Sequence, residues 1–177
     1  MILEKHNFKD SLFNNFALSR YLDEHNIAHL VGVDLETYGS VETKQIKDPS
    51  YSVNPDLLEA FAPELDDLSR LHWLVNTRKV TTILEFGLGK STIVFDDALS
   101  KNKLRDQHLI KDTLRRNNQY ECHSVDNYEQ WIDEVKSKNQ LDTVTYHKSK
   151  LLMGDFNGRV CTYYDPLPNL CPDFIYL

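Results

Sequence analysis

The chain has 177 residues, of which 41% are hydrophobic and 27% are charged, and its formal net charge is −7. This composition is typical of a globular protein with one ordinary core and an accessory segment, and no apolar run approaches the roughly 20 residues that span a membrane. The acidic balance argues against a surface that binds nucleic acid.

The first 55 residues predict an N-terminal extension. Apolar residues recur at helical spacing up to about residue 30, and the apolar run Ala28–Val33 predicts a short strand. Residues 39–55 are polar and contain several glycine and proline breakers, which is typical of a linker. We therefore divide the chain into a mainly helical extension, residues 1–55, and a second domain, residues 56–177.

Two histidines in this extension, His25 and His29, are four residues apart and would share one face of a helix. That spacing suits a metal ion, but the zinc-protease signature needs a glutamate directly after the first histidine, where Asn26 stands. No acidic third ligand is obviously placed. The pair therefore predicts surface histidines, and we expect no metal site.

A second helix is predicted to begin at Ala62-Pro63-Glu64, because proline is tolerated in a first turn and acidic residues complement the helix dipole there. This helix leads into the run Val80–Leu84, in which four of the five residues are β-branched. Such residues fit a pleated strand, and the apolar end of the run predicts that the strand is buried.

The residues after this strand predict a tight turn that opens a helix. Glu85 is followed by Gly87-x-Gly89 and by the pair Ser91-Thr92, which precedes an apolar helical segment. Glycine lets a ligand approach the backbone, and a hydroxyl can cap the exposed amides of the helix N-terminus. We expect a ligand in this crevice. The charge of Glu85 favours one with hydrogen-bond donors or a positive charge.

Two other glycine-loop motifs fit the spacing less well. A phosphate-binding P-loop would use Gly89-Lys90-Ser91, but it needs a leading glycine where Leu84 stands. A nicotinamide-binding fingerprint needs a third glycine where Thr92 stands. A tight turn without any ligand is the remaining alternative.

The next helix is predicted over residues 92–100, and a basic segment, residues 101–119, follows it. We interpret this segment as a solvated face, with a contact to an anionic substrate or to nucleic acid as the alternative. Residues Tyr120–Asp126 alternate like a strand that ends in an acidic residue. In nucleoside-binding crevices such a carboxylate accepts both ribose hydroxyls, so Asp126 is our candidate for that role, with a helix N-cap as the alternative.

The C-terminal residues predict two more strands and a hairpin. A third strand is predicted over residues 142–147, a hairpin arm over residues 159–164, and a fourth strand over residues 172–177. The predicted fold class is therefore α/β and Rossmann-like, a mostly parallel sheet of about four strands flanked by helices, with the mainly helical extension in front.

The segment LEFGLGKST, Leu84–Thr92, resembles the first motif of class I S-adenosylmethionine-dependent methyltransferases, an acidic residue followed by x-G-x-G. It is similar to the variety in which a serine, here Ser91, holds the place of the third glycine. The resemblance covers roughly residues 60 to 177. It implies S-adenosylmethionine as the cofactor and an unknown, small-molecule methyl acceptor.

The resemblance also implies which residues bind the cofactor. They are Glu85, Gly87, Gly89, Ser91 and Asp126. The first three would face the methionine end, and Asp126 would face the ribose. Asp155 falls where the family often places a residue that contacts adenine.

The family carries seven strands, and the residues that select and deprotonate the acceptor usually lie at the end of the fourth strand and beyond, whereas this sequence ends at Leu177. No catalytic residue is therefore assigned. We expect a cofactor-binding half that a longer gene product or a partner completes, with an uncovered edge of the fourth strand that invites oligomerisation. A non-catalytic Rossmann-like binding module and a binder of nucleotide phosphates stay open as other functions.

The three cysteines, Cys122, Cys161 and Cys171, are an odd and sparse set without a C-x-x-C pair. They indicate reduced thiols, and with no secretory signal at the N-terminus we expect a cytoplasmic protein. We expect the cysteines to be small buried side chains, with Cys161 and Cys171 on neighbouring strands.

Overall fold

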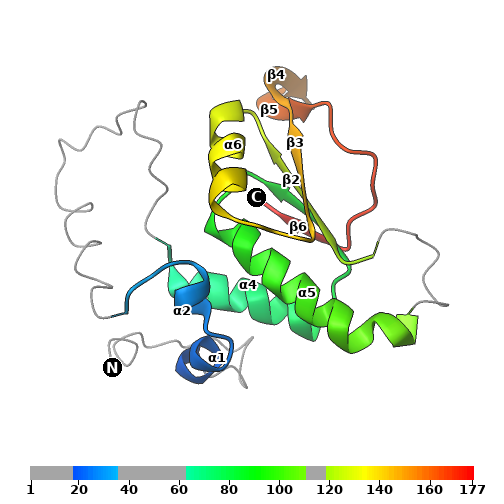
Figure 1. Ribbon diagram of the computed structural model, residues 1–177. Coiled ribbons are helices and arrows are strands. Elements are labelled where there is room, and N and C mark those ends of the chain that lie inside the picture. The colour runs from blue at the N-terminus through cyan, green and yellow to red at the C-terminus, as the bar shows by residue number, and fades with distance from the viewer. Residues whose placement is uncertain (1–17, 36–62, 111–118) are drawn as a thin grey trace. The chain divides into compact units, whose positions relative to one another are not determined.

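The computed structural model describes residues 18–35, 63–110 and 119–177, which are coloured in Figure 1. The chain divides into two compact units, Met1–Leu71 and His72–Leu177, and each is described by itself. The domain boundary and the linker predicted from the sequence lie outside the described residues. No helix within the three described ranges has the length and the apolar character of a membrane span.

Short helices make up the described part of the first unit. Helix α1 spans Leu18–Glu24, α2 spans Ile27–Leu30, and α4 spans Leu65–Thr77 and crosses into the second unit. The helical character predicted for the extension is confirmed from residue 18 to residue 30, and the predicted helix that starts with Pro63 is confirmed as α4. The predictions for residues 1–17 lie outside the described ranges.

The strand predicted for Ala28–Val33 is wrong. Ile27 and Ala28 are buried in α2, and Val31 is buried one helical turn later. This is the spacing of a helix face, whereas a strand would bury alternate residues. Gly32 then turns the chain with a positive φ of 70°.

The two histidines of this unit do not share a helix face. His29 is exposed on α2, whereas His25 lies half-buried in the turn before it. The ring of His25 stacks on Tyr21, with 4.2 Å between the ring centroids. The turn breaks the helical spacing on which a shared metal would depend.

The second unit is built on a four-stranded parallel sheet in the order β3-β2-β1-β6. The strands span Thr82–Phe86 (β1), Glu121–Asp126 (β2), Val144–Lys148 (β3) and Phe174–Tyr176 (β6). The four strands predicted for this region are confirmed. A parallel sheet with flanking helices is the Rossmann-like α/β fold that the sequence predicts.

Helix α5 (Lys90–Ile110) packs on the face of the sheet that carries β6's aromatic side chains. Phe95 of α5 is completely buried and meets Phe174 and Tyr176 edge to face, with ring centroids 5.9 and 5.5 Å apart. Edge-to-face contacts of this kind stabilise a core beyond the buried area alone. They hold α5 against the edge strand.

Helix α6 (Glu129–Lys138) packs on the same face (Figure 1). Tyr146 of β3 contacts a buried cluster at this helix, which consists of Leu88, Ile132 and Val135. Tyr146 pairs with Ser124, Ser124 with Glu85, and Glu85 with Tyr176 in the parallel register. Paired residues of a parallel sheet share a face, so α5 and α6 cover the face that bears Glu85.

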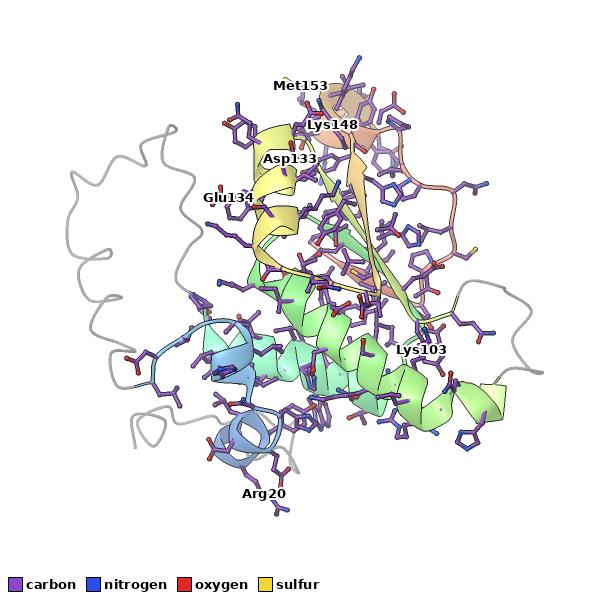
Figure 2. All side chains as sticks on the ribbon, viewed as in Figure 1. Arg20, Lys103, Asp133, Glu134, Lys148 and Met153 are labelled. Atoms are coloured by element: carbon purple, nitrogen blue, oxygen red, sulfur yellow. The ribbon has the colours of Figure 1, made fainter. Side chains whose placement is uncertain are left out.

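Helix α5 is longer than the predicted residues 92–100, because it continues through the basic segment to Ile110. Lys101 donates to Asp97 at 2.6 Å and Arg105 donates to Asp106 at 2.6 Å. Lys103, labelled in Figure 2, is exposed. The described part of this segment agrees with a solvated helix face, and residues 111–118 lie outside the described ranges.

Two polar contacts, one buried and one partly buried, hold the start of β1 in place. The Asn102 amide on α5 is completely buried and donates to the carbonyls of Val75 and Val80, at 2.9 and 3.0 Å. Across the sheet, the Asp173 carboxylate accepts the amide of Thr82 at 2.8 Å. Because buried polar groups are costly unless they are paired, these contacts specify where the strand begins.

A separate antiparallel hairpin, β4 (Lys150–Phe156) and β5 (Arg159–Asp165), starts directly after β3 and appears at the top of Figure 1. The predicted hairpin arm is confirmed. Asp155 lies near the hairpin tip, roughly 17 Å along the strand from Lys150 at about 3.4 Å per residue. Its carboxylate accepts the amide of Gly158 at 3.0 Å, which is a turn-forming contact, and the adenine contact stays a prediction.

The three cysteines differ in their surroundings, and all three are free thiols. Cys122 on β2 is completely buried, as predicted, and burial raises the pKa of its thiol. Cys161 on β5 is half-buried and Cys171 is exposed. The prediction that the last two lie on neighbouring strands is wrong, because Cys171 belongs to the segment between β5 and β6.

Candidate functional site

The candidate site lies where β1 and β2 end and α5 begins. In the parallel register Glu85 pairs with Ser124, and Asp126 follows two residues later on β2. Side chains alternate between the two faces of a strand, so these three residues point to the same face. The structure therefore brings both predicted carboxylates to one end of one face, next to the glycine turn.

Glu85 is completely buried, and three hydroxyl groups donate to its carboxyl oxygens. The donors are Ser91 at 2.5 Å, Thr92 at 2.8 Å and Ser124 at 2.6 Å. Burial raises the pKa of Glu85 to about 7, the hydroxyl donors oppose that rise, and the charge of Asp126 adds to it. Glu85 thus joins β1 and β2 to the first turn of α5.

Ser91, the residue in place of the third glycine, uses its hydroxyl for Glu85. The capping role predicted for Ser91 or Thr92 falls to Thr92, whose oxygen accepts the amide of Gly89 at 3.0 Å. The same oxygen donates to Glu85 at 2.8 Å. The Gly-x-Gly turn and the buried carboxyl are therefore parts of one hydrogen-bonded unit.

The other amides of the turn are also paired inside the protein. The amide of Gly87 donates to the carbonyl of Val125 at 2.8 Å, and the amide of Leu88 donates to the Asp126 carboxylate at 3.2 Å. A phosphate cradle needs several free amides that point at one anion. Here the amides of Gly87 and Leu88 are already paired with a carbonyl and a carboxylate of the protein, which disfavours the P-loop alternative.

The two glycines leave the surface of the turn open. Gly87 has a positive φ of 86°, a conformation that L side chains rarely adopt. A Cβ atom built on either Gly87 or Gly89 would meet no heavy atom within 4 Å. The glycines are therefore not required by crowding within the chain, and a ligand can approach the backbone there.

Asp126 is only 9% exposed and is held in place by backbone amides. One carboxylate oxygen accepts the amide of Leu88 and the other accepts the amide of Tyr128 at 2.8 Å. The amide of Ser149 also donates to the backbone carbonyl of Asp126 at 2.9 Å. Each carboxylate oxygen has a second lone pair, so the group can accept two further hydrogen bonds from a ligand without moving.

Aromatic residues far apart in the sequence surround this end of the sheet. Trp131 on α6 donates its indole N–H to the carbonyl of Leu88 at 2.8 Å, which fixes the turn from one side. Tyr164 on β5 stacks on Phe86, with ring centroids 5.5 Å apart. Burial raises the pKa of Tyr164, and the nearby charge of Asp126 raises it further.

The sequence analysis missed Trp131 and Tyr164. Trp131 had a weak signal, because it is an aromatic residue in the first turn of the helix that follows the acidic end of β2. Tyr164 had none, since its contact with Phe86 depends on the path of the hairpin back to the sheet. No local pattern reports such a contact.

Comparison of the chain with protein-family models, curated proteins and solved structures finds no match in any of the three. The fold alone does not decide the function, because Rossmann-like sheets carry many unrelated activities.

Proposed function

We propose that the second unit binds S-adenosylmethionine at the ends of β1 and β2 and that the protein acts as a methyltransferase. The observation that carries this proposal is the position of Asp126 beside an open glycine turn, on the face that also bears Glu85. In open α/β sheets, ligands bind outside the carboxyl ends of the strands. The candidate site has that location.

The charge of the site supports a ligand that is cationic or rich in donors. Asp126 occupies the amide of Leu88, which could otherwise bind an anion, and at neutral pH a part of the Glu85 population is also ionised, because its pKa is about 7. Negative charge in a partly buried site repels phosphate and attracts positive charge. The sulfonium and the ammonium of S-adenosylmethionine match this field.

The free lone pairs of Asp126 support a vicinal diol as the part of the ligand bound there. Two ribose hydroxyls can donate to the two carboxylate oxygens, each of which already has one fixed amide donor. Gly87 and Gly89 would line the remainder of the ligand through their backbone. Glu85 and Ser91 would hold the turn in shape without touching the cofactor.

When bound, S-adenosylmethionine supplies a methyl group activated by its sulfonium, and the protein contributes orientation and exclusion of water. We keep a small molecule as the proposed methyl acceptor and assign no residue as its base. We also keep the cytoplasm as the proposed location, where the three free cysteines would stay reduced.

Isothermal titration calorimetry with S-adenosylmethionine, S-adenosylhomocysteine and ATP with magnesium tests the proposal. We expect the two adenosyl compounds to bind and Asp126→Asn to weaken them at least tenfold, because the variant loses one charge and one acceptor. Asp133→Asn on α6, an exposed position labelled in Figure 2, is the matched control and should bind normally. Thermal melts confirm that both variants are folded.

Two results would contradict the proposal. One is an affinity for S-adenosylmethionine that Asp126→Asn leaves unchanged. The other is magnesium-dependent binding of ATP that Lys90→Ala abolishes, because Lys90 is the lysine that a P-loop would use.

A further inference from the structure

The β4–β5 hairpin exposes several large apolar side chains. Its large exposed side chains, between 47% and 76% accessible, are Leu151, Met153, Phe156, Val160 and Tyr163. A two-stranded hairpin is marginally stable in water unless further strands or a packed face support it. Met153, labelled in Figure 2, lies on this arm away from the four-stranded sheet. The hairpin therefore has the character of a contact surface.

Both strands of the hairpin have one unpaired edge. Within the described residues β4 pairs only with β5, and β5 only with β4. An unpaired edge presents a row of backbone N–H and C=O groups that another strand can bind. The two edges differ in what their side chains allow.

The sequence of β5, Arg159-Val-Cys-Thr-Tyr-Tyr-Asp165, is complementary to itself. Consider two copies of β5 paired antiparallel about a two-fold axis through Thr162. Arg159 then lies opposite Asp165 of the second copy, and this pair occurs twice. Val160 lies opposite Tyr164, and Thr162 faces its own copy. Opposite charges, an aromatic with a β-branched residue, and paired threonines are all favourable cross-strand neighbours.

The other edge lacks this complementarity. Two copies of β4 paired in the same way about Met153 would place Lys150 opposite Phe156 and Leu151 opposite Asp155. A charge opposite an apolar residue gains nothing from the pairing. The short β6, with three residues, offers less edge than the seven residues of β5.

We propose that two copies of this chain associate through the outer edges of their β5 strands, which forms a four-stranded antiparallel sheet in the order β4-β5-β5-β4. Charge complementarity identifies the occupant as a second copy, because both Arg159 and Asp165 are exposed and each finds its opposite in the pairing. Lys150 is already the cross-strand neighbour of Asp165 within the hairpin. In the dimer, Asp165 would lie between two positive charges.

The interface is expected to be weak. A seven-residue strand edge is a small contact compared with the roughly 1,600 Å² of a standard stable interface. We therefore expect a dimer that dissociates on dilution and weakens as salt screens the exposed ion pairs. The proposed dimer does not require a ligand in the second unit.

Charge reversal tests the register of the pairing. In sedimentation equilibrium of the 177-residue chain, Arg159→Asp and Asp165→Arg should each weaken the dimer at least tenfold, because each variant places two pairs of like charges opposite each other. An equimolar mixture of the two variants should recover dimers, since every introduced charge then faces an opposite one. Lys103→Asp, the same change at an exposed position on α5, is the control and should have no effect.

A cross-link tests the two-fold axis. In a Cys161→Ser, Cys171→Ser background, Thr162→Cys should give covalent dimers on mild oxidation, because residues directly opposite in an antiparallel pair have Cα atoms within the range of a disulfide. Asp155→Cys at the hairpin tip should not. A chain that stays monomeric at all accessible concentrations would overturn the proposal. So would a dimer whose affinity is unchanged by both charge reversals, or an equimolar mixture of the two variants that fails to form dimers.

Discussion

The turn after β1 and the β4–β5 hairpin both follow the carboxyl ends of sheet strands, yet they differ in which side chains are buried and which are exposed. At the turn, polar groups are enclosed and paired, as Glu85 is by three hydroxyls. On the hairpin, apolar groups are exposed, as Met153 is at 75% and Val160 at 76%. The difference teaches that the hydrogen bonds of the turn are already made within the chain, whereas the apolar side chains of the hairpin are not covered by the described residues.

Removal of the Glu85 side chain should have the largest effect on stability. Glu85→Ala leaves three buried or half-buried hydroxyls without their acceptor and opens a cavity, so we expect a loss of about 4 kcal/mol in the free energy of unfolding near pH 6. Met153→Ala on the hairpin should change it by less than about 0.5 kcal/mol, because the side chain is exposed. Urea unfolding measures both. Equal effects at the two positions would remove the contrast between the regions.

The pH dependence of stability should carry the signature of Glu85. Its pKa is raised from 4.5 to about 7 in the folded chain, chiefly by burial. A raised pKa stabilises the fold below about pH 4.5, and that stabilisation is lost as the pH rises through about 7. Relative to Glu85→Gln, the wild-type free energy of unfolding should fall over this window by up to about 3 kcal/mol. Stability curves that run parallel between pH 4.5 and 8 would contradict this assignment.

Two glycine substitutions test how well the backbone of the turn and the backbone of the hairpin each tolerate an added side chain. Gly87→Ala forces a side chain into a positive φ of 86°, so a loss of about 1 to 2 kcal/mol is expected although no atom obstructs the Cβ. Gly154→Ala on β4 would place a Cβ 2.8 Å from the Tyr163 ring, but that ring is 47% exposed and can move aside. We expect a change within about 0.5 kcal/mol there. If thermal melts showed a larger loss of stability for Gly154→Ala than for Gly87→Ala, the hairpin would be the more constrained region.

Local patterns in the sequence predicted the framework of the second unit. The run of β-branched residues became β1, the alternating segment ending in Asp126 became β2, and the glycine turn opens α5. These features depend on residues that are neighbours in the sequence, where strand and helix preferences are strongest. The same reasoning failed at Ala28–Val33, because a short apolar run does not distinguish a buried helix from a strand.

The environment of the candidate residues could not be predicted, because it depends on contacts between distant residues. Ser124 lies on another strand, and its hydroxyl helps to enclose Glu85, which the sequence placed in contact with the ligand. The stacking of Tyr164 on Phe86 depends on where the hairpin turns back. The exposure of Met153 follows from the hairpin leaving the sheet, which its apolar composition does not indicate.

Backbone amide chemical shifts during a titration with S-adenosylhomocysteine test the central claim most directly. We predict saturable shifts at Gly87, Gly89 and Tyr128, whose amides lie in the turn or bind Asp126, and none at Gly158 on the hairpin tip. The shifts should disappear in Asp126→Asn. Shifts confined to the hairpin, or no shifts at any concentration of the ligand, would contradict the account.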